Sequence, residues 1–251
     1  MVRIALVTGG GQGIGAEVCK QLAESGLRVV VTDINEANAK QLAASLGSGH
    51  VYKHLDVCDE QQVKQVFAEV EKELGPVSVL VCVAGLLIHD HGDRIPFHEM
   101  STDNWERTFQ VNARGVFFCG RELLALRQDG KAQQGRIVTF GSVAAQLGGY
   151  RSSSSYIAAK SAVMGLTKAM ARESAHLGFT VNSVAPGLID TEMLRSTVQS
   201  SGALSTAASN IPLGRIGTVA DVANAVSYLV SEQASYITGG VIDVNGGYRM
   251  Q

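Results

Sequence analysis

The sequence lacks the features that would place the protein in a membrane or an oxidising compartment. It has only four prolines, four cysteines and one tryptophan among 251 residues. The longest apolar run, Val79–Ile88, has ten residues and is interrupted by Gly85, whereas a membrane-spanning helix needs about 20. The apolar stretch at the amino terminus is too short for a secretory signal and has no cleavage site after it. The cysteines form no C-x-x-C pair, which argues against zinc or a disulfide framework and predicts a reducing, cytoplasmic setting.

The sequence also lacks a large excess of positive or negative charge. Lys and Arg number 21 against 23 for Asp and Glu, so the formal net charge is −2. We therefore expect no electrostatic binding to nucleic acid or to an acidic membrane. Hydrophobic residues make up 45% of the chain, which supports a sizeable core and excludes a disordered protein. Glycine is abundant, at 28 residues, and with so few prolines these glycines are expected at tight turns and close contacts.

Short β-branched runs alternate with longer helical segments through the whole chain. The predicted strands are Arg3–Val7, Arg28–Asp33, Val51–Asp56, Val77–Val83, Gly135–Phe140, Thr180–Ala185 and Val241–Val244. The predicted helices are Gly13–Ser25, Glu36–Leu46, Glu60–Leu74, Asp103–Arg127, Ser155–Leu177 and Val219–Val230. Several strands are apolar at nearly every position, which is typical of a parallel sheet covered on both faces. The pattern predicts a single α/β domain over residues 1–251, a Rossmann-type doubly wound parallel sheet of seven strands with helices on both faces.

Three less regular stretches follow strands, at residues 86–100, 141–154 and 187–217. In an open α/β sheet the loops after the carboxyl ends of the strands form the ligand crevice. These stretches are therefore the expected substrate loops. The last of them is rich in Ser and Ala, and we expect it to act as a lid that orders when substrate binds.

Glycines follow the first predicted strand and precede a helix. The segment Gly11-x-Gly13-x-x-Ala16 satisfies the G-x-G-x-x-G/A fingerprint. Glycines there let the backbone approach a pyrophosphate, whose charge sits at the helix N-terminus. The alternative is a glycine-rich turn without a ligand.

Asp33 ends the second predicted strand, twenty residues after Gly13. An acidic residue at that distance accepts hydrogen bonds from the adenosine ribose. A carboxylate also repels a 2′-phosphate, and no Arg or Lys stands at position 34 or 35, so NAD is favoured over NADP. The alternative is that Asp33 only caps the following helix.

Tyr156 and Lys160 are four residues apart, which places them on one face of a helix. A nearby ammonium favours the phenolate, so we expect the pKa of Tyr156 to fall below its usual value of about 10. A tyrosine with a lowered pKa acts as a general acid and base. The alternative is an ordinary amphipathic helix face.

Together with Thr8-Gly9-x-x-x-Gly13-x-Gly15, this pair resembles the classical short-chain dehydrogenase/reductase family over essentially the whole chain. The C-terminal segments 237–240 and 243–247 match the family's signature. The resemblance implies that the catalytic residues are Asn112, Ser142, Tyr156 and Lys160. It implies that the cofactor-binding residues are Gly9, Gln12, Gly13, Ile14, Gly15, Asp33, Asp56, Val57, Val83, Ala84, Gly85, Asn112, Tyr156, Lys160, Pro186, Gly187, Ile189 and Thr191.

The implied chemistry is hydride transfer between a secondary alcohol or ketone and NAD. Tyr156 takes the hydroxyl proton, Ser142 positions the reacting oxygen, and Lys160 binds the nicotinamide ribose. Asn112 is expected to hold a water that links Lys160 to solvent. The resemblance also implies a homotetramer, in which residues 103–127 and 155–177 pair between subunits. The apolar side chains Val116, Phe117, Phe118, Leu123 and Leu124 offer surface for that pairing.

The chain departs from the family pattern in two places. Cys82 and Val83 stand where the family has Asn-Asn, which puts the local support of the cofactor ribose in doubt. Ser142 and Tyr156 are 14 positions apart, about one more than usual, and we expect the extra residue within 148–151. The serines at 152–155 are interpreted as turn and N-cap residues rather than as the catalytic serine.

Apolar side chains dominate the three substrate loops, which suits a hydrocarbon-bodied alcohol rather than a sugar or a carboxylate. These residues are Leu86, Leu87, Ile88, Ala144, Ala145, Leu147, Leu188, Met193 and Leu194. They could instead pack on one another or on a neighbouring subunit. Two other functions stay open: a 3-oxoacyl-thioester reductase, which Asp33 disfavours because biosynthetic reductases usually use NADPH, and a nucleotide-sensing protein without catalysis. A basic docking patch would favour the reductase, and Arg121, Arg127 and Arg172 are its candidates.

No metal is expected in the reaction. His89, Asp90, His91 and Asp93 form an H-x-H segment that we interpret as a solvated turn. Some members of the family carry a structural divalent cation near the C-terminus, and the ending at residues 248–251 leaves that open.

Overall fold

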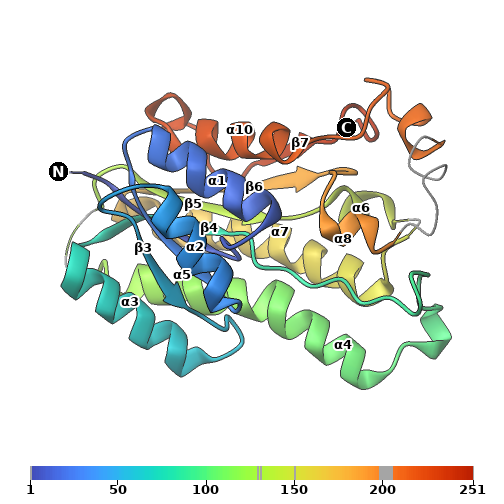
Figure 1. Ribbon diagram of the computed structural model, residues 1–251, viewed down its shortest axis with the longest axis horizontal. Helices are drawn as coiled ribbons and strands as arrows, with labels where there is room; N and C mark the ends of the chain where they lie inside the picture. Colours follow the sequence, from blue (N-terminus) through green and yellow to red (C-terminus); the bar gives the residue numbers. More distant parts are fainter. Residues whose placement is uncertain (1, 129, 131, 150, 198–205, 251) are drawn as a thin grey trace.

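The computed structural model describes residues 2–128, 130, 132–149, 151–197 and 206–250. Its centre is a sheet of seven parallel strands in the order β3-β2-β1-β4-β5-β6-β7 (Figure 1). The strands are β1 (Ile4–Thr8), β2 (Arg28–Asp33), β3 (Val51–His54), β4 (Val77–Cys82), β5 (Gly135–Phe140), β6 (Phe179–Pro186) and β7 (Val241–Val244). The predicted Rossmann-type doubly wound fold is confirmed.

Alternate residues of each strand serve two separate cores, one on each face of the sheet. In β1, Ile4 and Leu6 belong to one core cluster, and Ala5 and Val7 belong to the other. This division follows from the two-residue period of a strand. All four side chains are almost fully buried, which explains why the strand sequence is apolar throughout.

Helices cover both faces (Figure 1). One core takes side chains from α1, α2 and α10, and the other takes them from α3, α5 and α7. The bounds are α1 (Gly13–Glu24), α2 (Glu36–Ser45), α3 (Glu60–Leu74), α4 (Thr102–Phe109), α5 (Gly115–Ala125), α6 (Val143–Leu147), α7 (Ser154–Ser174), α8 (Glu192–Arg195) and α10 (Val219–Val230). None of the helices in the described residues is long and apolar enough to cross a membrane.

The prediction of one helix over Asp103–Arg127 is wrong in detail. Residues 102–125 form α4, a π-helical turn at Gln110–Arg114, and α5. The Asn112 side chain donates through Nδ2 to the Thr108 carbonyl, 2.9 Å away, and Gly115 N–H donates to the Gln110 carbonyl. Because a side chain takes the carbonyl that an α-helical N–H would use, the helix widens by one residue at this point.

Among the described residues, the short helices α6 after β5 and α8 after β6 were not predicted. Both lie within stretches that we expected to be irregular, and each has a polar N-cap: Ser142 accepts from Ala144 N–H and Thr191 accepts from Leu194 N–H. The remaining predicted boundaries agree with the observed ones or differ by at most two residues, except at the C-terminal end of Ser155–Leu177, where α7 ends at Ser174 and a 3₁₀ turn follows.

Candidate active site

A cleft of about 1460 Å³ opens at the carboxyl ends of the strands. β1 stands next to β4 in the sheet, while β2 and β3 continue on its other side, so the winding direction reverses between β1 and β4. Such a reversal creates the crevice in which open α/β sheets bind ligands. Every residue predicted to bind the cofactor lines this cleft except Asn112, and Ser142 lines it as well.

The glycine loop is shaped for close contact with a ligand and with β4. A side chain at Gly15 would collide with the Gly9 carbonyl oxygen, and one at Gly9 would come within 2.7 Å of Ala84 Cα. Gly13 has φ +53°, a conformation that favours glycine. The side chain of Gln12, the residue before α1, makes no capping hydrogen bond. The first N–H groups of α1 are therefore available to an anion such as a pyrophosphate.

Asp33 is held rigidly at the edge of the cleft. Its carboxylate accepts from Gly11 N–H and from Asn35 N–H, both at 2.9 Å. The side chain that caps α2 is Asn35, which accepts from Asn38 N–H at 3.1 Å. The alternative that Asp33 serves only as a helix cap is therefore wrong, because another residue fills that position.

Tyr156 and Lys160 share one face of α7 as predicted. Lys160 Nζ lies 5.7 Å from the centre of the Tyr156 ring and donates to the Phe140 carbonyl at 2.9 Å. Ser142 hydrogen-bonds the Tyr156 side chain from the start of α6, so β5, α6 and α7 together bring the three groups to one point. Ser153 caps α7, as expected for a serine of this segment.

Burial sets the pKa values of this group, and it overturns one expectation. The pKa of Tyr156 is raised by burial, and the Ser142 hydrogen bond opposes that rise only in part. The pKa of Lys160 is lowered by burial to about 8. The expected fall in the pKa of Tyr156 is thus absent, because desolvation disfavours the charged form of both side chains.

Asn112 is fully buried and does not line the cleft. Its Oδ1 accepts from Leu86 N–H at 3.2 Å, and its Nδ2 donates to the Leu86 carbonyl at 2.8 Å. The side chain therefore fixes the segment after β4, next to Gly85, where an added Cβ would lie 3.6 Å from Lys160 Nζ. Its Nδ2 also donates to the Thr108 carbonyl at 2.9 Å, so Asn112 ties α4 to the backbone after β4, and its role toward the cofactor stays a prediction.

The unusual Cys82-Val83 pair is accommodated by Thr8. Cys82 is buried in the core beside β1, where it pairs in register with Thr8. Val83 N–H donates to the Thr8 carbonyl at 3.2 Å, and Ala84 N–H donates to Thr8 Oγ1 at 3.4 Å. Both donors are backbone N–H groups, so the end of β1 and the segment after β4 are joined here without any side-chain bond from Cys82 or Val83.

The expected substrate loops contribute to the cleft unequally. Leu86, Leu87, Ala144, Leu147, Leu188, Met193 and Leu194 line it, whereas Ile88, His89, Ala145, Gln146 and Gly148 do not. Gln146 instead donates to Asp243 Oδ1 of β7 at 2.8 Å, which ties α6 to the C-terminal part of the chain. The leucines, Ala144 and Met193 of the first group therefore form the apolar wall of the cleft.

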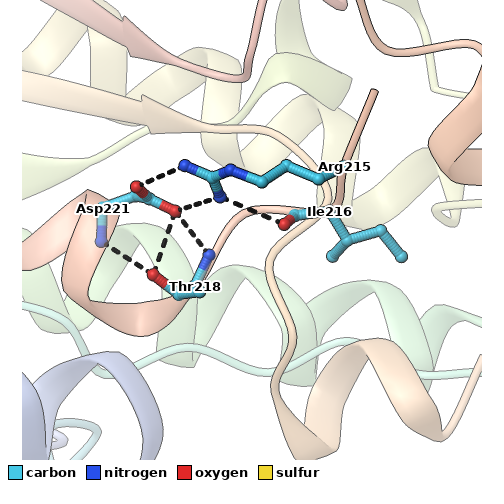
Figure 2. A network of polar contacts seen from close by, with 4 residues as sticks. All are labelled: Arg215, Ile216, Thr218 and Asp221. Carbon is cyan, nitrogen blue, oxygen red and sulfur yellow. Dashed lines mark hydrogen bonds and ion pairs between the residues drawn. The ribbon is translucent and has the colours of Figure 1, made fainter. Parts of the chain in front are cut away.

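The 187–217 segment is anchored at both described ends. Gly217 N–H donates to the Leu188 carbonyl at 2.9 Å, and its carbonyl accepts from Asp190 N–H at 2.8 Å. Asp221, the third residue of α10, pairs with Arg215 at 2.7 and 2.9 Å and forms a capping box with Thr218 (Figure 2). The Arg215 guanidinium holds the pKa of Asp221 well below its usual range. Residues 198–205, the middle of the expected lid, lie outside the described residues.

The H-x-H segment is a turn, as interpreted. Asp90 and Asp93 exchange two backbone hydrogen bonds, at 3.0 and 2.8 Å, around His91, whose φ is +47°. The side chains of Asp90 and His91 are exposed to solvent. His89 differs from them, because it is half-buried and burial lowers its pKa.

Several cleft residues were not predicted. They are Ile34, Leu55, Cys58, Asp103, Glu106, Arg107, Gln110, Val111, Phe140, Gly141, Val143, Gly149, Arg151, Ser152, Glu192, Thr197, Thr206, Ala207, Asn210 and Tyr248. Ten of them lie within the expected substrate loops 141–154 and 187–217, and most of the others flank or end a predicted element or site residue. The exceptions come from α4 and the π-helical turn after it and from Tyr248 near the C-terminal end, which only the tertiary fold brings to the cleft.

One cleft holds the glycine loop that can bind a dinucleotide, the Asp33 carboxylate and the group formed by Tyr156, Lys160 and Ser142. This combination is typical of an oxidoreductase that uses a nicotinamide cofactor. Residues 9–249 match the family model described as enoyl-(acyl carrier protein) reductase. The chain is 37% identical over 250 residues to the 3-oxoacyl-[acyl-carrier-protein] reductase FabG of Salmonella typhimurium, covering 99% of this chain and 98% of the relative. It is 36% identical over 248 residues to the cis-4-hydroxycyclohexanecarboxylate dehydrogenase of Sinomonas cyclohexanicum, covering 98% of this chain and 96% of the relative.

A solved structure is also similar. It is titled short-chain dehydrogenase/reductase SDR:Glucose/ribitol dehydrogenase from Brucella melitensis, with a TM-score of 0.89 and 32% identity over 99% of this chain and 97% of that one. The protein belongs to the short-chain dehydrogenase/reductase family.

Proposed function

We propose that this enzyme uses NAD to interconvert a secondary alcohol and a ketone. The observation that carries the cofactor preference is the Asp33 carboxylate, fixed at the cleft by Gly11 N–H and Asn35 N–H. Held there, it accepts hydrogen bonds from ribose hydroxyls and repels a 2′-phosphate. No Lys or Arg stands at positions 34 or 35 to offset that repulsion.

The proton chemistry belongs to Tyr156. In the oxidative direction its phenolate takes the proton of the substrate hydroxyl, and in reduction it returns that proton. The chemistry that NAD would supply when bound is that of the hydride acceptor in oxidation and of the hydride donor, as NADH, in reduction. Ser142, which hydrogen-bonds Tyr156, orients the reacting oxygen, and Lys160, held by the Phe140 carbonyl, binds the nicotinamide ribose.

The lining of the cleft on the substrate side favours a substrate with an apolar body next to the reacting carbon. Leu86, Leu147 and Met193 line the cleft from three separate loops. Leu147 and Met193 are exposed in the structure, at 42% and 38%, so a hydrocarbon ring or chain would gain by covering them.

A second candidate is reduction of a 3-oxoacyl thioester, which the FabG relatives favour. A basic docking patch would support it, with Arg121, Arg127 and Arg172 as its candidates. Arg127 is buried and paired with Glu71, and Arg121 pairs with Glu60 while stacking on Phe117. Two of the three candidate arginines are thus engaged within the chain.

The test is cofactor-linked turnover of a panel of cyclic, aliphatic and aryl secondary alcohols and one 3-hydroxyacyl thioester, with NAD and with NADP. We expect turnover of hydrocarbon-bodied alcohols with NAD. In Asp33→Asn, the ratio of kcat/KM for NAD to that for NADP should fall about 10- to 100-fold, because a charged acceptor is lost and the repulsion is removed.

Glu36→Gln is the matched control, since it removes an exposed carboxylate from α2 outside the cleft, and the ratio should stay unchanged. Tyr156→Phe serves as the inactive reference. Turnover confined to the thioester with NADP would replace the proposal by the second candidate.

A further inference from the structure

Basic side chains are few in the cleft. Among the described residues that line it they are Lys160, Arg107 and Arg151. Lys160 lies beside Tyr156 and is bonded to the Phe140 carbonyl. Arg107, on α4, lies within electrostatic range of Cys58, which follows β3 on the adenosine side of the cleft, although burial raises the pKa of that thiol overall. Arg151 therefore provides the guanidinium group on the substrate side of the cleft.

Arg151 stands where three loops meet. It precedes Ser152 and lies five residues before Tyr156. Its Nη1 donates to the Thr197 carbonyl, in the segment after α8, at 3.3 Å. Arg94, from the loop after β4, donates to the Gly149 carbonyl at 2.8 Å and so holds the loop that carries Arg151.

The charge of Arg151 is not neutralised within the described residues. Its one hydrogen bond is to a carbonyl, and no ion pair joins it to Glu192, the acidic residue of α8 in the same cleft. Two other exposed arginines nearby are each paired through two bonds: Arg195 with Asp190 at 2.9 and 3.0 Å, and Arg215 with Asp221 at 2.7 and 2.9 Å. Arg151 keeps donors free on a planar group that matches the two oxygens of a carboxylate or phosphate.

We propose that Arg151 binds an anionic group of the substrate, so that the substrate is a secondary alcohol or ketone with an apolar body and a carboxylate or phosphate at its far end. The inference rests on the proposed function, and it departs from the expectation that the loop composition disfavours a carboxylate. Leu86, Leu147 and Leu194 would contact the apolar body. The negative group would lie beyond it, at the meeting point of the loops.

The experiment compares a cyclic hydroxycarboxylate with its methyl ester, with NAD as cofactor. The wild-type enzyme should prefer the acid. In Arg151→Gln the ratio of kcat/KM for the acid to that for the ester should fall about 10- to 100-fold, the usual worth of a charge-assisted hydrogen bond. Arg151→Lys should retain part of the preference, because it keeps the charge without the planar fork.

Arg195→Gln is the matched control, since it alters a nearby arginine that is already paired, and it should leave the ratio unchanged. A 3-hydroxyacyl-CoA and the corresponding thioester without phosphate distinguish a carrier phosphate from a carboxylate as the group bound. An acid-to-ester ratio that Arg151→Gln leaves unchanged, together with an unchanged CoA preference, would overturn the proposal.

A binding measurement separates this proposal from the proposed function. Cyclohexanecarboxylate and cyclohexanecarboxamide are titrated into the enzyme with NADH, and nicotinamide fluorescence is followed. Weaker binding of the carboxylate alone in Arg151→Gln supports the anion site even if no alcohol is turned over. Equal binding by wild type and variant contradicts it even if neutral alcohols are oxidised.

Discussion

At the scale of single residues, burial opposes charge on both members of the Tyr–Lys pair. The pKa of Tyr156 is raised and that of Lys160 is lowered to about 8. Lys160 donates to the Phe140 carbonyl, which holds it in place in either protonation state. Burial therefore favours the uncharged form of both side chains in the site without ligand.

The depressed pKa of Lys160 makes stability depend on pH in a defined direction. Between about pH 8 and 10.5 the unfolded chain holds a proton on this lysine that the folded chain has lost, so wild-type stability rises with pH in that window. Lys160→Met lacks this contribution. Its free energy of unfolding minus that of wild type should be constant below about pH 8 and fall by roughly 2 kcal/mol towards pH 10.

Urea unfolding without cofactor at pH 7, 8, 9 and 10 measures that difference. Lys20→Met is the control, because Lys20 is half-exposed on α1, and its difference from wild type should not change with pH. A difference for Lys160→Met that is equally flat would show that Lys160 titrates near its ordinary value.

At the scale of elements, the break between α4 and α5 supports the active site. Asn112 bonds Thr108 within the helix and Leu86 after β4, so one buried side chain couples the π-helical turn to the cleft. Gly115, which follows the turn, packs against Val57, where an added Cβ would come within 2.7 Å of that side chain. The π-helical turn is thus held in place by the Asn112 hydrogen bonds and by the close packing of Gly115 on Val57.

Asn112→Ala should destabilise the protein by about 3 kcal/mol, because the buried Thr108 carbonyl and the half-buried backbone groups of Leu86 lose their partner. Urea unfolding at pH 7 gives the value. Asn104→Ala is the matched control, because Asn104 lies in α4, just before the π-helical turn, and is only half-buried. This variant should lower the free energy of unfolding much less. Equal costs for the two variants would mean that the Asn112 hydrogen bonds add nothing to stability.

At the scale of the whole molecule, assembly is still a prediction from the family. Of the five apolar side chains expected to pair between subunits, Val116, Phe118 and Leu123 are buried within the chain. Phe117 is 40% exposed, and Arg121 covers it at 4.8 Å. The exposed apolar surface of α5 is therefore smaller than the sequence suggested.

We nevertheless propose a homotetramer. Sedimentation equilibrium at micromolar concentration should give about four times the chain mass of 26.5 kDa. Phe117→Asp should reduce the assembled fraction, whereas Phe97→Asp, which changes an exposed ring outside α4 and α5, should not. A wild-type monomer under these conditions would reject the proposal.

The sequence alone determined the fold class, because strand–helix alternation and fully apolar strands leave few architectures for one chain. It also located most of the cleft, since Gly15, Asp33 and Tyr156 have local spacings that fix their place on the first turn, the second strand and one helix face. Such local patterns depend only on the periods of helices and strands, so they can be recognised in a sequence before its tertiary structure is known.

Only the tertiary structure decided what depends on contacts between distant segments. Thr8 bonds the backbone after β4, Asn112 turns inward to Leu86, and Arg151 meets Thr197 across two loops. The shifts in the pKa values of Tyr156 and Lys160 likewise follow from desolvation by the packed sheet and helices. Burial and contact across the fold have no local signature, so the sequence pattern could not reveal them.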